Sequence, residues 1–454
     1  MSPPTVRDKK CLMIAYFFPP LGGIGSLRTL KFCKYLPHYG WLPYILTTQR
    51  GLKYPQDATL LEQVPAEVQV FRAPCIDPAR IEALLLLQWK LLWKVRLRRL
   101  AMAVEPYKVM RWLAFPDPMF TWLGPAFAKG LHVMLKYQVP VVYTTAPPFT
   151  SHLVGYLLKI ATGALWVADF RDPWSRNPFT VYPIGALRAL NTYLERKTLQ
   201  RADGVITVHK RCLQRLDCDT ASHQEDKIDI IPNGYDPEDF QDAPSGPLKE
   251  RFTLAYVGSL YGLRTARYLL TAMNTLVQQG QIPEDKVHVI LQGTMGDPSV
   301  REFYNCSWLE VREPVSHREA ILTMRAADVL LLLVTGGEEV NYCVTGKVFE
   351  YMATGRPILA MAPPTGAAAQ LVLGSGTGVV VPAEDVGEIS RTLLELYKRW
   401  EAGNLTFQRN EDFVRQFDRR SLTAKLAILL DRLIGQDNRP GFSGQNDGPT
   451  VICS

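Results

Sequence analysis

Residues 344–360 constrain the fold more than any other stretch of this sequence. Residues 347–352 suit a short helix, Gly355 suits the left-handed cap that ends it, and residues 357–360 form an apolar run that suits a strand. This order of loop, helix, turn and strand is typical of proteins that alternate helices with parallel strands. We therefore expect an α/β fold.

The start of this helix has the composition of an anion site. Thr345 and Gly346 precede Lys347, so free backbone N–H groups, a hydroxyl and an ammonium meet at the positive end of the helix, where a phosphate is stabilised. Glu350 lies one turn further on and could accept hydrogen bonds from a ribose diol. An equally simple alternative is a solvated Lys–Glu surface pair that contributes only a few tenths of a kcal/mol. The spacing alone favours this alternative.

The motif Lys-x-x-Glu-Tyr-x-Ala-x-Gly-Arg-Pro-Ile, which begins at Lys347, resembles the donor-site signature of the retaining family 4 glycosyltransferases. The resemblance implies that Glu350 contacts the ribose of a nucleotide. The family pattern has a second Glu eight positions earlier, where this chain has Tyr342. Tyr342 cannot supply a carboxylate to the transferred sugar, and Glu338 or Glu339 is the expected substitute.

Length, charge and cysteine usage exclude several classes of protein. The 454 residues fit two domains and a tail, and the net charge of +7 suggests anionic ligands or an anionic surface rather than a nucleic-acid coat. No apolar run approaches the roughly eighteen residues of a spanning helix. The apolar run after Lys10 ends at Pro19 without a cleavage site, so we expect a buried strand and a cytoplasmic protein. The eight cysteines lack zinc spacing and are expected to be reduced.

The first half begins with a β-α-β pattern, in which strand 12–18 and strand 43–48 flank a helix over 26–36. Gly22, Gly23 and Gly25 lie in the first loop but do not match the dinucleotide-binding fingerprint. The motif Pro-Pro-x-Gly-Gly-Ile-Gly-Ser-x-Arg resembles the first loop of the same glycosyltransferase family, which lies over the donor phosphates. The resemblance implies that Gly22 and Gly23 bind the donor.

Residues 81–111 differ from the rest of the chain. On a helix, Trp89 and Trp93 share an apolar stripe, while Lys90, Lys94 and Arg98 line its flank. This composition is typical of an interfacial helix, which would form a reversible anchor on an anionic membrane. An amphipathic core helix with a basic solvent face explains the pattern equally well.

Another candidate site follows the strand expected over residues 165–170. Ligands bind at the carboxyl ends of strands in open α/β sheets, which favours Arg171 and Asp172 as cleft residues, although they could also form a mutual salt bridge. Residues 145–155 and 169–174 resemble the bacterial branch of the family that builds surface polysaccharides. Many relatives carry His in place of Arg171. Further acceptor-side candidates are His152, Asp117 and Trp174, and His209 is at most cleft-lining.

The second half repeats the β-α pattern, with a strand over 252–257 and a helix over 266–279. Relatives place a basic residue six positions after Gly258 to hold the diphosphate, and Arg264 matches it. Ser259 stands where relatives often have Arg. The remaining expected elements are strands 287–292, 329–334 and 379–381, and helices 318–327, 386–399 and 410–434.

The resemblance covers nearly the whole chain and implies the GT-B fold, in which two Rossmann-like domains face a cleft and the last helix returns to the first domain. The expected divisions are an acceptor domain over 1–235, a linker over 236–250, a donor domain over 251–405, the returning helix over 406–434 and a disordered tail over 435–454. The implied reaction moves a sugar from a nucleotide-diphosphate donor to a hydroxyl, with retention.

The expected catalytic residues are Arg264, Lys347, Arg171 and Asp172, and the expected donor-binding residues are Gly22, Gly23, Ser259, Arg264, Thr345, Gly346, Lys347 and Glu350. No metal or other cofactor is expected. A lipid-linked saccharide at the inner face of the membrane is the expected acceptor, and the oligomeric state is left open. Two alternatives remain: a nucleotide-sugar epimerase of the same fold, and a non-catalytic membrane-docked scaffold for polysaccharide assembly.

Overall fold

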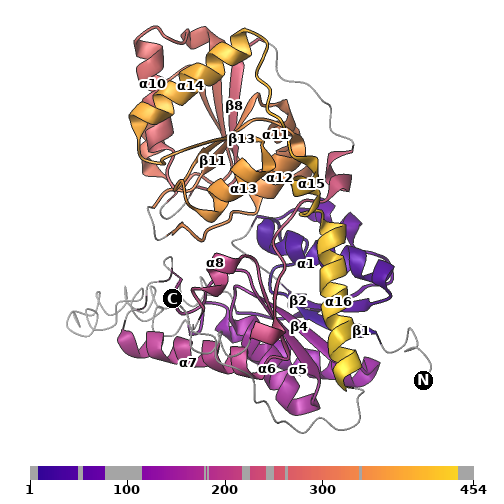
Figure 1. Cartoon of the computed structure of the whole chain (residues 1–454). Helices are drawn as coiled ribbons and strands as arrows, with labels where there is room; N and C mark the ends of the chain where they lie inside the picture. Colours follow the sequence, from indigo (N-terminus) through magenta and orange to yellow (C-terminus); the bar gives the residue numbers. More distant parts are fainter. Residues whose placement is uncertain are drawn as a thin grey trace, which may run out of the picture.

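A computed structural model shows two α/β domains stacked end to end and joined at one side (Figure 1). The residues that the structure describes are 9–49, 55–76, 115–177, 180, 182, 184–216, 225–241, 250–260, 264–336 and 340–437. The basic segment 81–111, Glu338, Glu339 and the tail beyond residue 437 lie outside these ranges.

The N-terminal domain contains, among the described residues, a parallel seven-stranded sheet in the order β3-β2-β1-β4-β5-β6-β7. Its inner strands are buried along nearly their whole length, as expected for a parallel sheet that is covered on both faces. The strands are β1 (Lys10–Ile14), β2 (Leu42–Thr48), β3 (Gln69–Ala73), β4 (Val141–Ala146), β5 (Leu165–Phe170), β6 (Gly204–Thr207) and β7 (Ile228–Ile230).

Helices pack on both faces of this sheet and enclose two apolar clusters. The described helices of this domain are α1 (Ile24–Tyr35), α5 (Leu123–Tyr137), α6 (Thr150–Thr162), α7 (Gly185–Arg201) and α8 (Lys210–Leu213), with short 3₁₀ turns η1 (Leu36–Tyr39), η2 (Ala58–Gln63), η3 (Phe120–Trp122) and η4 (Glu225–Lys227). Strand β1 ends at Ile14, four residues before the expected end of the strand at Phe18, and the chain then turns into the glycine loop that leads to α1.

The C-terminal domain contains, within the described part, a parallel six-stranded sheet in the order β10-β9-β8-β11-β12-β13. Its strands are β8 (Phe252–Val257), β9 (Val287–Gln292), β10 (Leu309–Arg312), β11 (Val329–Leu333), β12 (Ile358–Met361) and β13 (Gly378–Val381). Its helices and 3₁₀ turns are α10 (Arg267–Gln278), η6 (Glu284–Lys286), η7 (Pro298–Phe303), α11 (His317–Ala326), α12 (Lys347–Thr354), α13 (Ala367–Ser375), α14 (Val386–Glu401) and α15 (Glu411–Arg415). A capping box of Ser316 and Glu319 begins α11, and Gly355 ends α12 in the left-handed conformation with φ 71°.

Two chain segments cross between the domains side by side. The first leaves the N-terminal sheet through Tyr235 and η5 (Pro237–Phe240), and the second leads from α15 to α16 (Arg419–Asp437). Backbone bonds join them, because the Tyr235 N–H donates to the Phe417 carbonyl at 3.0 Å and the Arg419 N–H donates to the Tyr235 carbonyl at 2.9 Å.

The prediction of one continuous helix over residues 410–434 is therefore wrong, because the structure has two helices there. The crossing interrupts it at residues 416–418, so that α15 belongs to the C-terminal core and α16 to the N-terminal core. The expected return to the first domain is confirmed: α16 packs along α1 (Figure 1) and buries its leucines against β1 and α1. These features match the GT-B architecture that the sequence predicts.

Candidate active site

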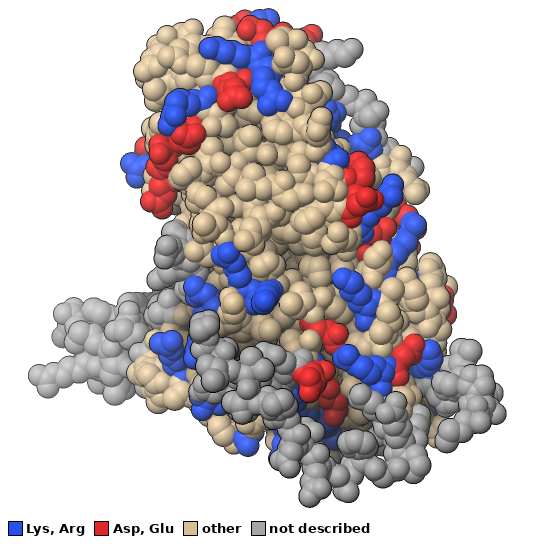
Figure 2. All heavy atoms as spheres, in the orientation of Figure 1, with Lys and Arg blue, Asp and Glu red and all other residues tan. Residues whose placement is uncertain are grey.

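A cleft of about 550 Å³ lies between the domains and is lined by loops from both sheets. The carboxyl ends of β1 and β5 supply the N-terminal wall, and the ends of β8, β9, β10 and β11 lead into the opposite wall. All the residues predicted for catalysis and donor binding line this cleft: Gly22, Gly23, Arg171, Asp172, Ser259, Arg264, Thr345, Gly346, Lys347 and Glu350. On the face seen in Figure 2, basic side chains gather where the two domains meet.

Helix α12 points its N-terminus into the cleft. Gly346 is its N-cap residue and offers no side chain to bond the first N–H groups. The Thr345 hydroxyl is buried and has no hydrogen-bond partner among the described residues. An unpaired hydroxyl and a helix N-terminus without a side-chain cap both favour an anionic ligand at this position.

Lys347 is the first residue of α12, and its Nζ lies 3.9 Å from the centroid of the Tyr256 ring. Burial and, to a smaller extent, charge repulsion from Arg264 lower the pKa of Lys347 to about 7, although Glu350 opposes the shift. A negatively charged group such as a diphosphate, bound beside these two cations, would offset their mutual repulsion.

Glu350 is 7 % exposed and lies one turn into α12. Its Oε1 is 2.8 Å from the Nε2 of His317, the first residue of α11. Burial lowers the pKa of His317, but the neighbouring Glu350 and Asp239 carboxylates outweigh that effect and raise it above its ordinary value. The Lys–Glu pair is therefore not a solvated surface pair, because Lys347 packs on Tyr256 and Glu350 bonds to His317.

Residues 251–399 match the family model described as "Glycosyl transferases group 1". The C-terminal domain of the chain is therefore similar to the group 1 glycosyltransferases. This match confirms the predicted enzyme class, a retaining glycosyltransferase of the EC 2.4 type. No curated protein matches the sequence of this glycosyltransferase.

Solved structures share the fold of this glycosyltransferase at low sequence identity. Sucrose-phosphate synthase from Thermosynechococcus elongatus is 16 % identical with a TM-score of 0.65, and the match covers 94 % of this chain and 100 % of that one. The Anabaena protein HepE, solved in complex with UDP-glucose, is 15 % identical with a TM-score of 0.60 and coverages of 93 % and 99 %. A putative UDP-N-acetylglucosamine 2-epimerase from Listeria monocytogenes is 12 % identical with a TM-score of 0.53 and coverages of 96 % and 98 %. These likenesses establish the fold alone.

Arg171 and Asp172 lie on the N-terminal wall of the glycosyltransferase cleft. The Arg171 guanidinium donates to the carbonyls of Ala146, at 3.3 Å, and Pro147. The mutual salt bridge that the sequence left open is not formed between these two described residues. Burial raises the pKa of Asp172, while Arg171 and, from the opposite domain, Arg264 oppose the shift. Asp172 thus faces the predicted diphosphate site across the cleft.

Tyr342, at the position of the second family Glu, is 4 % exposed and packs on Val208 and Cys212 of the N-terminal domain. The guanidinium of Arg215 lies 4.8 Å from the centroid of its ring. The Tyr342 hydroxyl is buried and lacks a partner among the described residues. An aromatic contact between the domains therefore occupies the position where relatives have a carboxylate.

The three acceptor-side candidates lie apart from the described lining of the cleft. Asp117 caps α6, because its carboxylate accepts the Thr150 N–H at 2.7 Å. His152 is fully buried with its Nδ1 2.8 Å from the Thr144 hydroxyl, and burial lowers its pKa to about 3. Trp174 is 1 % exposed, and its ring stacks on Phe149 at 4.6 Å. These contacts are structural, so an acceptor role for the three residues stays a prediction.

His209 is not among the described residues that line the cleft; its Nδ1 accepts the Arg211 N–H at 3.1 Å, which caps α8.

Two further parts of the cleft were not predicted from the sequence: His317, and the loop after β9, where Gly293 and Thr294 line the cleft. Both could have been found, since they follow strand ends on the same edge of the sheet as Lys347. No helix in the described part is long and apolar enough to cross a membrane. No group of three or more described His, Cys, Asp or Glu side chains could hold a metal ion, and the metal-independent reaction stays a prediction.

Proposed function

We propose that this glycosyltransferase binds a nucleoside diphosphate sugar with its diphosphate at the N-terminus of α12 and transfers the sugar, with retention, to a hydroxyl of a lipid-linked saccharide. The arrangement around Lys347 carries the proposal. Its ammonium, the neighbouring Arg264 and the unpaired Thr345 hydroxyl belong to the same wall of the cleft, and Glu350 lies one turn further along α12.

In the proposed reaction, the bond between the anomeric carbon and the diphosphate oxygen breaks, and its electron pair leaves with the diphosphate. The acceptor oxygen forms a new bond to the same face of the anomeric carbon. The acceptor proton passes to the departing diphosphate, which gains negative charge. Lys347 and Arg264 stabilise that charge, and each charged hydrogen bond of this kind contributes roughly 1.5–3 kcal/mol.

The observations support the proposed nucleotide-sugar donor more strongly than the proposed lipid-linked acceptor. The match to group 1 glycosyltransferases spans the whole cleft wall of the C-terminal domain, and the structurally similar HepE binds UDP-glucose, which makes UDP the first nucleotide to test. The Trp-rich basic composition of residues 81–111 motivates the lipid-linked acceptor and a position at the inner face of the membrane.

Calorimetric titration with UDP and GDP, without added metal, tests the donor site. We expect one nucleotide to bind the wild type, and Lys347→Ala and Glu350→Ala to weaken it by about tenfold or more. Arg391→Ala serves as a matched control, since Arg391 is exposed on α14 far from the cleft lining. If neither nucleotide binds, the proposal is refuted and the scaffold alternative takes its place.

The fold likeness to an epimerase keeps one catalytic alternative open. Incubation with UDP-glucose and UDP-N-acetylglucosamine separates the two activities by product analysis. An epimerase converts the free sugar nucleotide without an acceptor. A transferase releases UDP and, given a lipid-linked saccharide, yields a product whose anomeric configuration can be read by NMR.

A further inference from the structure

His317 contacts three separate parts of the molecule. Its Nε2 lies 2.8 Å from Glu350 Oε1 in the donor wall. Its backbone N–H donates to Asp57 Oδ2 of the N-terminal domain at 2.7 Å. Its Nδ1 lies 4.0 Å from Asp239 Oδ2 in the linker turn η5. His317 thus contacts the opposite domain through its backbone, and through its side chain it contacts the cleft residue Glu350 and the hinge, which the two crossing segments form.

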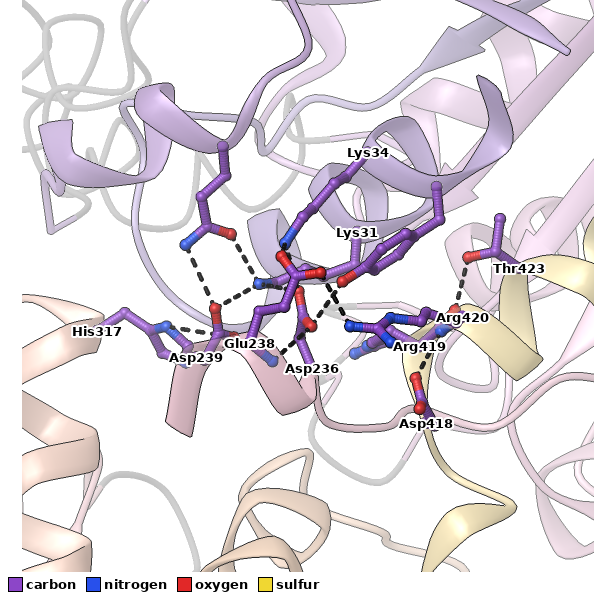
Figure 3. A network of polar contacts seen from close by, with 12 residues as sticks. Lys31, Lys34, Asp236, Glu238, Asp239, His317, Asp418, Arg419, Arg420 and Thr423 are labelled. Atoms are coloured by element: carbon purple, nitrogen blue, oxygen red, sulfur yellow. Dashed lines mark hydrogen bonds and ion pairs between the residues drawn. The ribbon is translucent and has the colours of Figure 1, made fainter. Parts of the chain in front are cut away.

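The contact with Asp239 leads into a network of charges at the hinge (Figure 3). Lys31 of α1 donates to Asp239 at 2.6 Å and to Asp236 at 2.7 Å. The network continues through Lys34 and Glu238 to Arg420 on α16, with ion pairs of 2.6 Å and 2.9 Å. It therefore joins α1, the linker and the returning helix, the three segments that define how the domains meet.

Glu350 depends on His317 for its orientation. Among the described residues, no other group donates a hydrogen bond to the Glu350 carboxylate, although its side chain is only 10 % exposed. A buried carboxylate without a donor is costly, and such a group reorients or takes up a proton. With one oxygen held by His317, the other is left for a ligand in the cleft that Glu350 lines.

We propose that His317 is a positioning residue: it holds Glu350 in the orientation that accepts the ribose hydroxyls of the donor, and it ties that orientation to the hinge through Asp239. This inference rests on the proposed assignment of Glu350 to the ribose. It adds a residue outside the donor signature and predicts that a linker carboxylate away from the cleft affects nucleotide affinity.

Calorimetry with UDP, or with GDP if the wild type prefers it, tests the first half. His317→Ala is expected to weaken nucleotide binding by about tenfold, the value of one charged hydrogen bond. His317→Gln keeps an N–H near the same oxygen, so we expect it to recover most of the affinity. Inorganic pyrophosphate, used as a competitor, lacks a ribose and should bind His317→Ala as it binds the wild type.

A double-mutant cycle separates positioning from a general structural effect. In a Glu350→Ala background, His317→Ala should change nucleotide affinity by less than twofold, because the carboxylate on which it acts is gone. An undiminished loss in that background, or an equal loss for pyrophosphate, overturns the positioning role. A wild type that binds no nucleotide instead refutes the proposed function, so the two failures are distinguishable.

Asp239→Asn tests the link to the hinge. Lys31 keeps Asp236 and Gln63 as partners in this variant, so the N-terminal domain should fold normally. We expect UDP affinity to fall by about two- to fivefold, because the imidazole ring of His317 loses one of the two carboxylates beside it. Affinity equal to that of the wild type would overturn the hinge link and leave the pairing with Glu350 as the whole of the inference.

Discussion

The side chain of Ile24, from the glycine loop of the N-terminal domain, lies directly against the Cα of Gly346 in the donor loop of the other domain. A Cβ built on Gly346 would meet Ile24 Cδ1 at 2.3 Å. The two glycine-containing loops singled out from the sequence thus touch each other across the cleft. A methyl group added at position 346 would therefore displace the Ile24 side chain or separate the two loops.

Gly346→Ala should therefore hold the domains slightly apart. We expect a loss of roughly 1–3 kcal/mol in nucleotide binding, the usual range for overpacking at a tight contact. Titration calorimetry measures it, and Ile24→Ala in the same chain should recover most of the affinity by vacating the space. The same loss in both backgrounds would mean that Ile24 is not the obstacle.

Nucleotide affinity should depend on pH through Lys347. Because the pKa of Lys347 is lowered to about 7, its charge is lost as pH rises above 7, and the attraction for a diphosphate is lost with it. UDP affinity should fall by up to about tenfold per pH unit between pH 7 and 9. Lys347→Arg stays charged over this range, so its profile should be flat relative to the wild type. Parallel profiles for the two proteins would show that Lys347 is already neutral or already charged throughout.

Replacing Gly234 should destabilise the hinge. A Cβ at this position would lie 2.0 Å from the Phe417 carbonyl oxygen of the second crossing segment. Both sides of this contact are backbone, so the strain cannot be relieved by a rotamer change. Gly234→Ala should lower the free energy of unfolding by roughly 1–3 kcal/mol or more. Thermal unfolding measures it against Gly124→Ala, a position in α5 with no atom near the added Cβ, where alanine should be neutral or stabilising.

Arg28 belongs to the first glycine-loop motif, yet it is fully buried, and its Nε and Nη2 donate to the two carboxylate oxygens of Asp169 at 2.8 and 2.9 Å. Its remaining N–H groups reach the carbonyls of Ile231 and Pro232, just before the hinge. Arg28→Ala should destabilise the fold by roughly 3–5 kcal/mol because the buried Asp169 carboxylate loses its counterion and keeps only the hydroxyl groups of Tyr143 and Thr145 as partners. Urea denaturation checks this, with a shift no larger than that of exposed Arg391→Ala counting against the buried pair.

Tyr342 should stabilise the contact between the domains through its aromatic ring rather than through its hydroxyl. The hydroxyl lacks a described partner, so Tyr342→Phe should change thermal stability by less than about 1 kcal/mol. Tyr342→Ala removes the ring from Val208 and Cys212 and should cost roughly 2–4 kcal/mol at the domain contact. A large loss on Tyr342→Phe would instead indicate that the hydroxyl has a bonding role in the closed cleft.

Local sequence patterns predicted the elements and the donor motif well. Strands over 165–170, 252–257 and 287–292 have the predicted bounds, because each is an apolar run bounded by polar or turn residues. Lys347 and Glu350 could be recognised because a helix start and its first turn bring them together within a few residues. Interactions of this range are encoded in the spacing itself.

Tertiary structure alone decided which distant residues meet. His152 and Trp174 were acceptor-side candidates because they belong to motifs that resemble the family, but in the structure both side chains are buried. His317 carries no local signal that it faces Glu350, and nothing near residue 417 indicates that the chain there crosses beside Tyr235. These contacts form only when the two domains pack against each other. The pattern of apolar and polar residues along one segment contains no information about which residues of the other domain it will meet.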